Sequence, residues 1–237
     1  MSERPNESAS TENFEFNALR EAHNYRRALR KMFAPHLRGR VIEIGAGCGQ
    51  FTAQLRELTA IHHLLAIEPD PRFCAEFRQT LPAQPLVEGV ITTVTDPGPW
   101  NAIVSVNVLE HIRDDLEELK IYSHLLQKEH GHLCLLVPAC PEIFAPIDSD
   151  FGHHRRYSRP DLRRKLENAG FKILALHYFN FIGYFAWWFN FKLMGQRKFN
   201  PAMVRLFDRA IFPLGSGLES HLARPPVGQS LIAIAEA

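Results

Sequence analysis

Short apolar runs alternate with amphipathic stretches along most of the chain. The runs have the length and β-branched content of buried strands, and the intervening stretches place apolar residues at helical intervals. The predicted strands span residues 41–44, 64–67, 85–87, 102–106, 133–137, 171–176 and 230–235. The predicted helices span residues 14–37, 50–58, 71–80, 114–127 and 160–169. Strands that alternate with helices in this way predict an α/β fold, in which a parallel sheet is covered by helices on both faces.

The beginning of the chain differs from the rest. Residues 1–13 are polar, rich in Ser, Glu and Asn, and contain no apolar core of a signal peptide, so we expect a flexible tail and a cytoplasmic protein. No repeat and no long linker divides residues 14–237, which favours a single domain. Residues 178–228 are predicted to form an insertion before the last strand.

The insertion begins with an aromatic segment. Residues 178–194 hold nine aromatic side chains, interrupted by Asn180, Gly183, Asn190 and Lys192. Those interruptions argue against a membrane-spanning helix, which needs about 20 mainly apolar residues. A lid over an apolar substrate, a helix on a membrane surface and a core helix would each have this composition. We therefore expect residues 178–228 to act as a substrate lid or a membrane-contacting insertion, with the core interpretation still open.

Composition excludes several classes of protein. The balance of 27 Lys and Arg against 26 Asp and Glu gives a net charge of +1, so the broad positive field typical of nucleic-acid binding is absent. A hydrophobic fraction of 46% is typical of a globular chain. The four cysteines are scattered and form no C-x-x-C pair, which argues against a disulfide scaffold or a cysteine zinc site.

The strongest motif is V-I-E-I-G-A-G-C-G at residues 41–49, a strand that runs into a G-x-G-x-G turn before a helix. Glycines permit positive φ angles and let the backbone approach a ligand at the helix start. A dinucleotide fingerprint has its third glycine one residue later, where this chain has Gln50, and that counts against NAD. Glu68, 19 residues after Gly49, is placed to accept the ribose hydroxyls of a nucleoside cofactor. NAD and other nucleoside cofactors both present such hydroxyls, so Glu68 does not decide whether the cofactor is NAD.

With these features the sequence resembles the class I S-adenosylmethionine-dependent methyltransferases. The resemblance covers nearly the whole chain and is carried by VIEIGAGCG at 41–49, AIEPD at 66–70, NVLEHIRDD at 107–115, GHLCLLVPACPEIFAPID at 131–148 and GHHRRYSRPDLRRKLENAGF at 152–171. It implies a Rossmann-like, doubly wound, mostly parallel seven-stranded sheet with helices on both faces, to which this chain adds the aromatic helical insertion. It also implies S-adenosyl-L-methionine as the cofactor.

The resemblance also implies which residues bind the cofactor. The methionine side is expected to be lined by Glu43, Gly45, Ala46, Gly47, Gly49 and Asn107. Glu68, followed by Pro69, takes the ribose hydroxyls. Many members have Gly-Asp after the third strand, but this chain has Gly89-Val90, so the backbone there is expected at the adenine without a carboxylate. Tyr25 either caps the cofactor or is a core tyrosine.

Methyl transfer from a sulfonium needs alignment, and it needs a base only where the acceptor must lose a proton. His111, after the fourth strand, is a candidate base, or else it caps a helix or packs under the loop. His154 and Tyr157 are further catalytic candidates in loop 148–159, whose side chains could also grip a carboxylate or phosphate. Alternatively, Arg155 and Arg156 brace that loop through ion pairs. No metal is expected, because adjacent histidines point in different directions and the loop offers no further ligands at suitable spacing.

The sequence thus predicts a methyltransferase acting on a hydrophobic or amphipathic small molecule, lipid-like or aromatic, with an acidic head if the basic loop binds an anion. Two rival classes stay open: a non-catalytic or membrane-peripheral binding protein that retains the cofactor fold, and an NAD-dependent oxidoreductase. A non-methylating reaction of the same cofactor is also open. We expect no nucleic-acid partner, and the pattern leaves the oligomeric state open.

Overall fold

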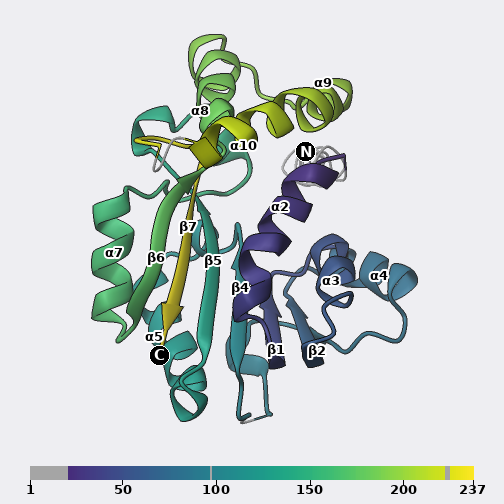
Figure 1. Cartoon of the computed structure of the whole chain (residues 1–237). Coiled ribbons are helices and arrows are strands. Elements are labelled where there is room, and N and C mark those ends of the chain that lie inside the picture. The colour runs from purple at the N-terminus through teal and green to yellow at the C-terminus, as the bar shows by residue number, and fades with distance from the viewer. Residues whose placement is uncertain (1–20, 97, 222–224) are drawn as a thin grey trace, which may run out of the picture.

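One seven-stranded sheet forms the centre of the protein (Figure 1). The computed structural model describes residues 21–96, 98–221 and 225–237. The strand order is β3-β2-β1-β4-β5-β7-β6. The strands are β1 (Gly39–Ile44), β2 (Ile61–Glu68), β3 (Leu86–Glu88), β4 (Ala102–Val106), β5 (His132–Pro138), β6 (Lys172–Phe179) and β7 (Ser230–Glu236). All neighbours pair in parallel except β7, which is antiparallel to both β5 and β6. This confirms the predicted mostly parallel, Rossmann-like sheet.

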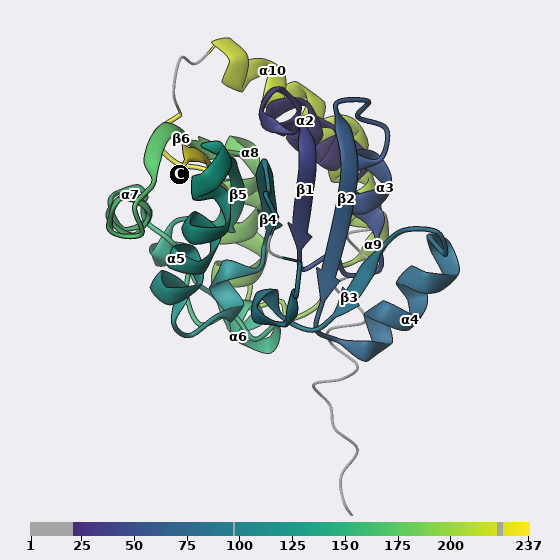
Figure 2. The same ribbon diagram turned by 90° about the horizontal axis from the view of Figure 1, so that it is seen from below.

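Helices cover both faces of the sheet (Figure 2). They are α2 (His23–Phe33), α3 (Gln50–Leu55), α4 (Pro71–Thr80), α5 (Asp115–Leu126), α6 (Pro146–Asp150), α7 (Arg159–Asn168), α8 (Phe181–Trp187), α9 (Pro201–Leu206) and α10 (Phe212–His221). Apolar side chains of α2 and α3 pack on one face, and those of α5 and α7 pack on the other. Alternate residues of the central strands therefore face two separate apolar layers, as a doubly wound sheet requires.

The first helix is held by the insertion. The predicted helix over residues 14–37 begins at His23 in the described part of the chain, while the predicted tail 1–13 and residues 14–20 lie outside the described residues. The backbone N–H groups of Asn24 and Tyr25 each donate to the carboxylate of Asp208 at 2.9 Å. The first N–H groups of a helix have no partners within the helix, and the buried carboxylate of Asp208 accepts hydrogen bonds from two of them.

The insertion between β6 and β7 lies beyond the carboxyl ends of the parallel strands, where Figure 1 shows α8, α9 and α10 gathered at the top. Its aromatic side chains divide into two groups. Trp187 and Phe191 are buried against each other with ring centroids 4.7 Å apart, whereas Trp188 and Phe189 are 44% and 52% exposed. Part of the segment is therefore core and part faces outward. No helix among the described residues is long and apolar enough to cross a membrane.

Candidate functional site

The glycine turn after β1 is formed as its sequence requires. Gly45, Gly47 and Gly49 have φ angles of +70°, +53° and +84°, in the left-handed region that glycine adopts without strain. A Cβ atom on Gly45 would lie 2.3 Å from Cγ2 of Val108, which follows β4. The turn is therefore packed against the β4 loop, and no side chain fits between them.

The carboxylate of Glu68 joins the end of β2 to this turn. It accepts hydrogen bonds from the N–H of Gly47 at 2.8 Å and from the N–H of Asp70 at 2.9 Å. Burial raises the pKa of Glu68, and the two N–H donors oppose that shift. The arrangement fixes an acceptor beside the glycine turn, where a ribose would present its hydroxyls.

Glu43 is a buried acid on β1, close to the turn. Burial raises its pKa to about 8, and the nearby charge of Glu68 acts in the same direction. Its Oε2 atom has no hydrogen-bond partner among the described residues. A buried acceptor without a partner is costly unless a ligand satisfies it, and a cationic ligand group would do so best. Glu43 therefore fits the ammonium of a bound methionine moiety.

The remaining expected cofactor residues also follow strand ends at this edge. Asn107 comes after β4, is exposed, and has a φ angle of +53°. The N–H of Gly89, after β3, donates to the Glu68 carbonyl at 2.9 Å. Val90 and Pro69 are exposed. Strands β1 to β4 thus bring the turn, the acid and these loops to one edge of the sheet.

Tyr25 lies in a different environment. Its ring packs against Phe179 and Phe212, with centroids 5.0 and 5.5 Å away, and its hydroxyl is 3.3 Å from Oγ of Ser230. These neighbours belong to β6, α10 and β7 and lie on the insertion side of the molecule. The placement favours the core interpretation of Tyr25 over a cofactor cap.

Two loops at the carboxyl edge bring a carboxylate and two histidines together. Glu110 and His111 follow β4, and His153 follows α6; one ligand atom from each lies within 4.8 Å of the others. Glu110 is 0% exposed, and neither of its carboxylate oxygens has a hydrogen-bond partner in the described residues. Burial raises the pKa of Glu110 to about 7. Partial burial lowers the pKa of His111, and the neighbouring His153 and His154 lower it further through charge repulsion. Part of the His111 side chain remains exposed to solvent.

The other two catalytic candidates are placed less favourably for chemistry. His154 is exposed, and its backbone N–H donates to the Glu110 carbonyl at 2.9 Å, which fixes the loop and leaves the ring outside the cluster. Tyr157 is fully buried, with its hydroxyl 2.8 Å from Oδ2 of Asp115 and 3.2 Å from the Leu109 carbonyl. Burial and the Asp115 carboxylate raise the pKa of Tyr157. This geometry favours a structural role for Tyr157.

The arginines of the same loop form ion pairs. Arg155 lies 2.7 Å from Asp115, and Arg156 lies 2.8 Å from Asp148 and 4.3 Å above the ring of Trp187. Both members of the Arg156–Asp148 pair are buried. The structure thus confirms the alternative in which these arginines brace the loop. Arg156 does not bind a substrate anion in this arrangement, because its buried guanidinium already pairs with Asp148 and lies over the ring of Trp187.

The sequence interpretation missed Glu110 and Asp148 as functional candidates. The available signal was the acid directly before His111 at the end of a strand, together with the acid five residues before His153. Their convergence depends on how two separate loops fold over the sheet edge. Pattern alone did not reveal it.

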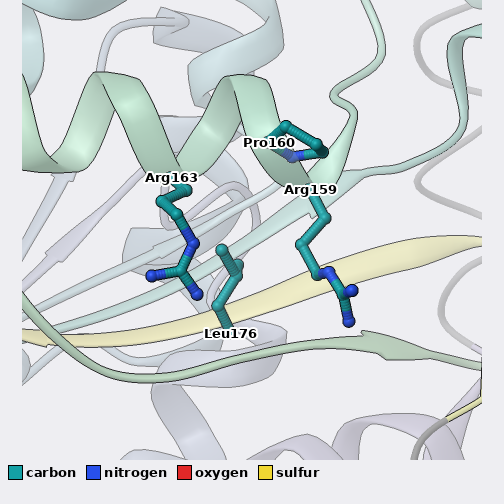
Figure 3. A pocket seen from close by; sticks show the side chains of 4 residues that line it. All are labelled: Arg159, Pro160, Arg163 and Leu176. Carbon is teal, nitrogen blue, oxygen red and sulfur yellow. The ribbon is translucent and has the colours of Figure 1, made fainter.

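A separate hollow of about 350 Å³ lies between α7 and β6 and is lined by Arg159, Pro160, Arg163 and Leu176. Both arginine side chains extend from α7 toward β6 (Figure 3). It contains none of the expected site residues. We therefore place the candidate site at the carboxyl edge, around the glycine turn and the β4 loop.

Comparison with known proteins identifies the family of this chain. Residues 16–176 match the family described as a methyltransferase domain. No curated protein matches the sequence. Among solved structures, an S-adenosylmethionine-dependent methyltransferase from Mesorhizobium loti is similar with a TM-score of 0.61 and 17% identity, covering 92% of this chain and 100% of that one. An Archaeoglobus fulgidus SAM-dependent methyltransferase has a TM-score of 0.59 and 16% identity, covering 95% and 99%.

A third similar structure is phosphoethanolamine N-methyltransferase 2 from Haemonchus contortus in complex with S-adenosyl-L-methionine. Its TM-score is 0.66 at 14% identity, with 97% of this chain and 58% of that chain covered. At such identities these likenesses show the shared fold, and the family match covers more than half of this chain.

Proposed function

Since the chain belongs to the methyltransferase-domain family and is an S-adenosylmethionine-dependent methyltransferase, we propose that it methylates a hydrophobic or amphipathic small molecule. The observation that carries the substrate class is the exposed apolar surface of the insertion, which lies beyond the same sheet edge as the glycine turn. An apolar acceptor can bury its own surface there, and that gain is roughly 25 cal/mol per Å² removed from water.

The described residues fit the cofactor. Oε2 of Glu43 is a buried acceptor without a hydrogen-bond partner among the described residues, and the turn after β1 has the backbone conformation that its glycines allow. Glu68 presents a carboxylate beside that turn for the ribose hydroxyls. When bound, S-adenosylmethionine supplies a methyl group on a positively charged sulfur. The protein then has to align the acceptor and exclude water, and alignment alone can account for much of the rate enhancement.

The insertion has the composition that an amphipathic acceptor requires. Among the residues whose side chains are described, its exposed large apolar side chains are Phe185, Trp188, Phe189, Leu193, Met194, Met203, Leu206, Ile211 and Leu214. Basic residues stand between them at Lys192, Arg197, Lys198, Arg205 and Arg209, and the acid within residues 181–217 is the buried Asp208. Arg197 and Arg205 form ion pairs with Asp150 and Glu21, which lie outside the insertion. Apolar contact with nearby positive charge suits a molecule with an apolar tail and an acidic head.

Contact with a membrane surface is the second candidate, because exposed Trp and Phe beside basic residues are also typical of helices that lie in the lipid interface. On this view the insertion would collect a lipid-borne acceptor from the bilayer. Co-sedimentation with vesicles distinguishes it: binding to vesicles with anionic lipid, and weaker binding to neutral ones, would support this candidate. Absence of binding to either would leave acceptors dissolved in water.

Acceptor screening with radiolabelled S-adenosylmethionine tests the proposal. The panel pairs hydroxyl- or amine-bearing acids that carry an alkyl or aryl tail with the same head groups lacking the tail. We expect turnover with the tailed compounds and a KM at least about tenfold lower than for the tailless ones, which corresponds to about 1.4 kcal/mol. A panel in which the tail makes no difference would contradict the substrate class.

A double variant of the insertion and a control variant outside it make the test specific to the insertion. Trp188→Ser combined with Phe189→Ser should raise the KM for tailed acceptors and leave the Kd for S-adenosylmethionine unchanged. The matched control is Leu174→Ser, an equally exposed apolar residue on β6, which is 42% exposed. It should alter neither constant. An equal rise in KM for both variants would mean that the insertion has no special part in acceptor binding.

A further inference from the structure

The cluster after β4 has the composition of a metal site. Glu110, His111 and His153 supply one carboxylate oxygen and two imidazole nitrogens, all within 4.8 Å of one another. Two histidines and one carboxylate form a common protein ligand set for zinc and other divalent transition ions, and such three-ligand sites keep a position open.

Glu110 gives the first independent indication of a ligand. The residue is 0% exposed, and neither carboxylate oxygen has a hydrogen-bond partner in the described part of the chain. Its Oε1 atom lies 3.9 Å from Nε2 of His153, which is too long for a hydrogen bond. A buried carboxylate without hydrogen-bond partners is costly. A cation bound between Glu110 and His153 would remove that cost.

His153 gives the second indication, because its ring is oriented by another residue. Nδ1 of His153 lies 3.2 Å from Oδ1 of Asp148, and an ionised carboxylate only accepts, so Nδ1 carries the proton. In the neutral imidazole, Nε2 on the Glu110 side then carries the lone pair that a metal ion needs. A histidine that donates its other N–H to a carboxylate is the usual arrangement around protein-bound metals.

The orienting carboxylate is itself firmly held. Asp148 accepts from Nε of Arg156 at 2.9 Å and from the backbone N–H of Ala145 at 2.8 Å. Arg156 in turn donates to the Ala139 carbonyl at 3.1 Å. This chain of contacts fixes the position of His153. His111 completes the set, with its ring edge-on to that of His153 at a centroid distance of 4.7 Å. Because His111 is the exposed member, its ring can turn to close on an ion.

We infer that Glu110, His111 and His153 bind one divalent transition-metal ion of the zinc type, oriented by Asp148 and reached from the side of His111. This revises the expectation that the chain has no metal site, which rested on the adjacency of His153 and His154. The structure uses only the first of that pair and supplies the missing ligands from the β4 loop.

The ion has a chemical use at this place, and this step rests on the proposed function. An acceptor hydroxyl bound at the open position releases its proton to solvent more readily, because a divalent cation stabilises the oxyanion. The oxyanion attacks the methyl carbon of S-adenosylmethionine, the carbon–oxygen bond forms, and the carbon–sulfur bond breaks. Its electron pair stays on sulfur, which leaves neutral S-adenosylhomocysteine. In this scheme His111 is a metal ligand rather than the base.

The test is titration calorimetry of zinc chloride, and separately manganese chloride, into the full chain after treatment with a chelator. We expect one ion per chain with a Kd in the micromolar range or below for zinc. Glu110→Gln and His111→Ala should each weaken zinc binding at least 100-fold. The matched control is His62→Ala, an exposed histidine in β2 outside the cluster, which should leave the Kd unchanged. Equal zinc binding by all four proteins, or none by the wild type, would overturn the inference.

Thermal unfolding keeps the test valid if a variant folds poorly. Zinc should raise the Tm of the wild type and of His62→Ala but not that of Glu110→Gln, since a ligand stabilises only the state that binds it. Glu110→Gln removes no side-chain hydrogen bond seen in the described residues, so its own Tm should not fall. A zinc-dependent rise in the Tm of Glu110→Gln equal to that of the wild type would contradict the assignment.

Failure of this inference is distinguishable from failure of the proposed function. S-adenosylmethionine should bind the chelated protein with a Kd within about twofold of the zinc-loaded one, because the glycine turn and Glu68 hold it without the ion. Cofactor binding without zinc binding would overturn only the metal site. Zinc binding with full turnover by the chelated enzyme would overturn the role of the ion in activating the acceptor and leave the site itself in place.

Discussion

Glu68 accepts a 2.8 Å hydrogen bond from the backbone N–H of Gly47, so the acid at the end of β2 and the turn at the end of β1 form one unit. The contact joins residues that lie 21 positions apart in the chain. It places a buried carboxylate where parallel strands end and where a nucleoside ligand binds in sheets of this type. Cofactor affinity should therefore depend on Glu68 both directly and through the turn.

Replacing Glu68 with Ala should weaken S-adenosylmethionine binding by about 2–3 kcal/mol, or roughly 30- to 150-fold, because hydrogen bonds to a charged acceptor are lost. Titration calorimetry on wild type and variant measures this directly. Glu68→Gln serves as the control that retains size and one acceptor oxygen, and it should lose less. A Glu68→Ala variant that binds as tightly as the wild type would remove Glu68 from the cofactor site.

Gly45→Ala should destabilise the protein by more than about 2 kcal/mol. The φ angle of +70° costs a non-glycine residue about 1–2 kcal/mol, and the new Cβ atom would stand 2.3 Å from Cγ2 of Val108. The free energy of unfolding from denaturant titration measures the loss.

Val108→Ala separates the two causes. The double variant should be less destabilised than the sum of the single variants by more than about 0.5 kcal/mol, because removing the Val108 methyl groups relieves the clash but leaves the strain. Strict additivity would show that the β4 loop moves away from the turn at no cost.

The stability of the protein should depend on pH through Glu43. Its pKa is about 8 in the folded state against an ordinary value of 4.5, so the folded state binds more protons between these two values. Stability contributed by this residue is therefore full below pH 4.5 and falls as the pH rises toward 8. Glu43→Gln should reduce the downward slope of unfolding free energy across that window. An identical pH profile for variant and wild type would show that Glu43 ionises normally.

Cofactor binding should release a proton through the same residue. A methionine ammonium next to Glu43 favours the carboxylate, so near pH 7 the carboxyl should lose its proton when the ligand binds. The binding enthalpy should then vary with the ionisation enthalpy of the buffer for the wild type. For Glu43→Gln the dependence should be weaker, and an unchanged dependence would place the ammonium elsewhere.

Tyr157→Phe should lower stability without removing catalysis. The substitution leaves Asp115 with its ion pairs to Arg155 and Lys165 but without a 2.8 Å hydrogen bond, a loss of about 1–2 kcal/mol. We expect a lower Tm and a turnover rate within about twofold of the wild type. Loss of an acid or base slows turnover by roughly 100-fold or more, so a decrease of that size at unchanged stability would return Tyr157 to the catalytic groups.

The strands, most helices and the sheet edge that holds the glycine turn and Glu68 could be predicted from the sequence because their causes are local. Apolar runs define buried strands, and the predicted bounds of β4 and α4 agree with the observed Ala102–Val106 and Pro71–Thr80. The glycine turn is local too, since the backbone conformation at Gly45, Gly47 and Gly49 suits glycine and few other residues. Glu68 follows a predicted strand, and parallel strands end at one edge.

The rest depended on which distant segments pack together. Tyr25 and Tyr157 are polar-tipped aromatics whose role follows from their surroundings, and only packing showed that one contacts Phe179 and the other binds Asp115. Glu110 and His153 come from different loops, and their approach depends on how the loop after α6 packs against the loop after β4. A sequence pattern records which residues are apolar or charged along one element. A contact between two elements depends on the shapes of both elements. Such contacts are determined only when the whole sheet and its covering helices pack together.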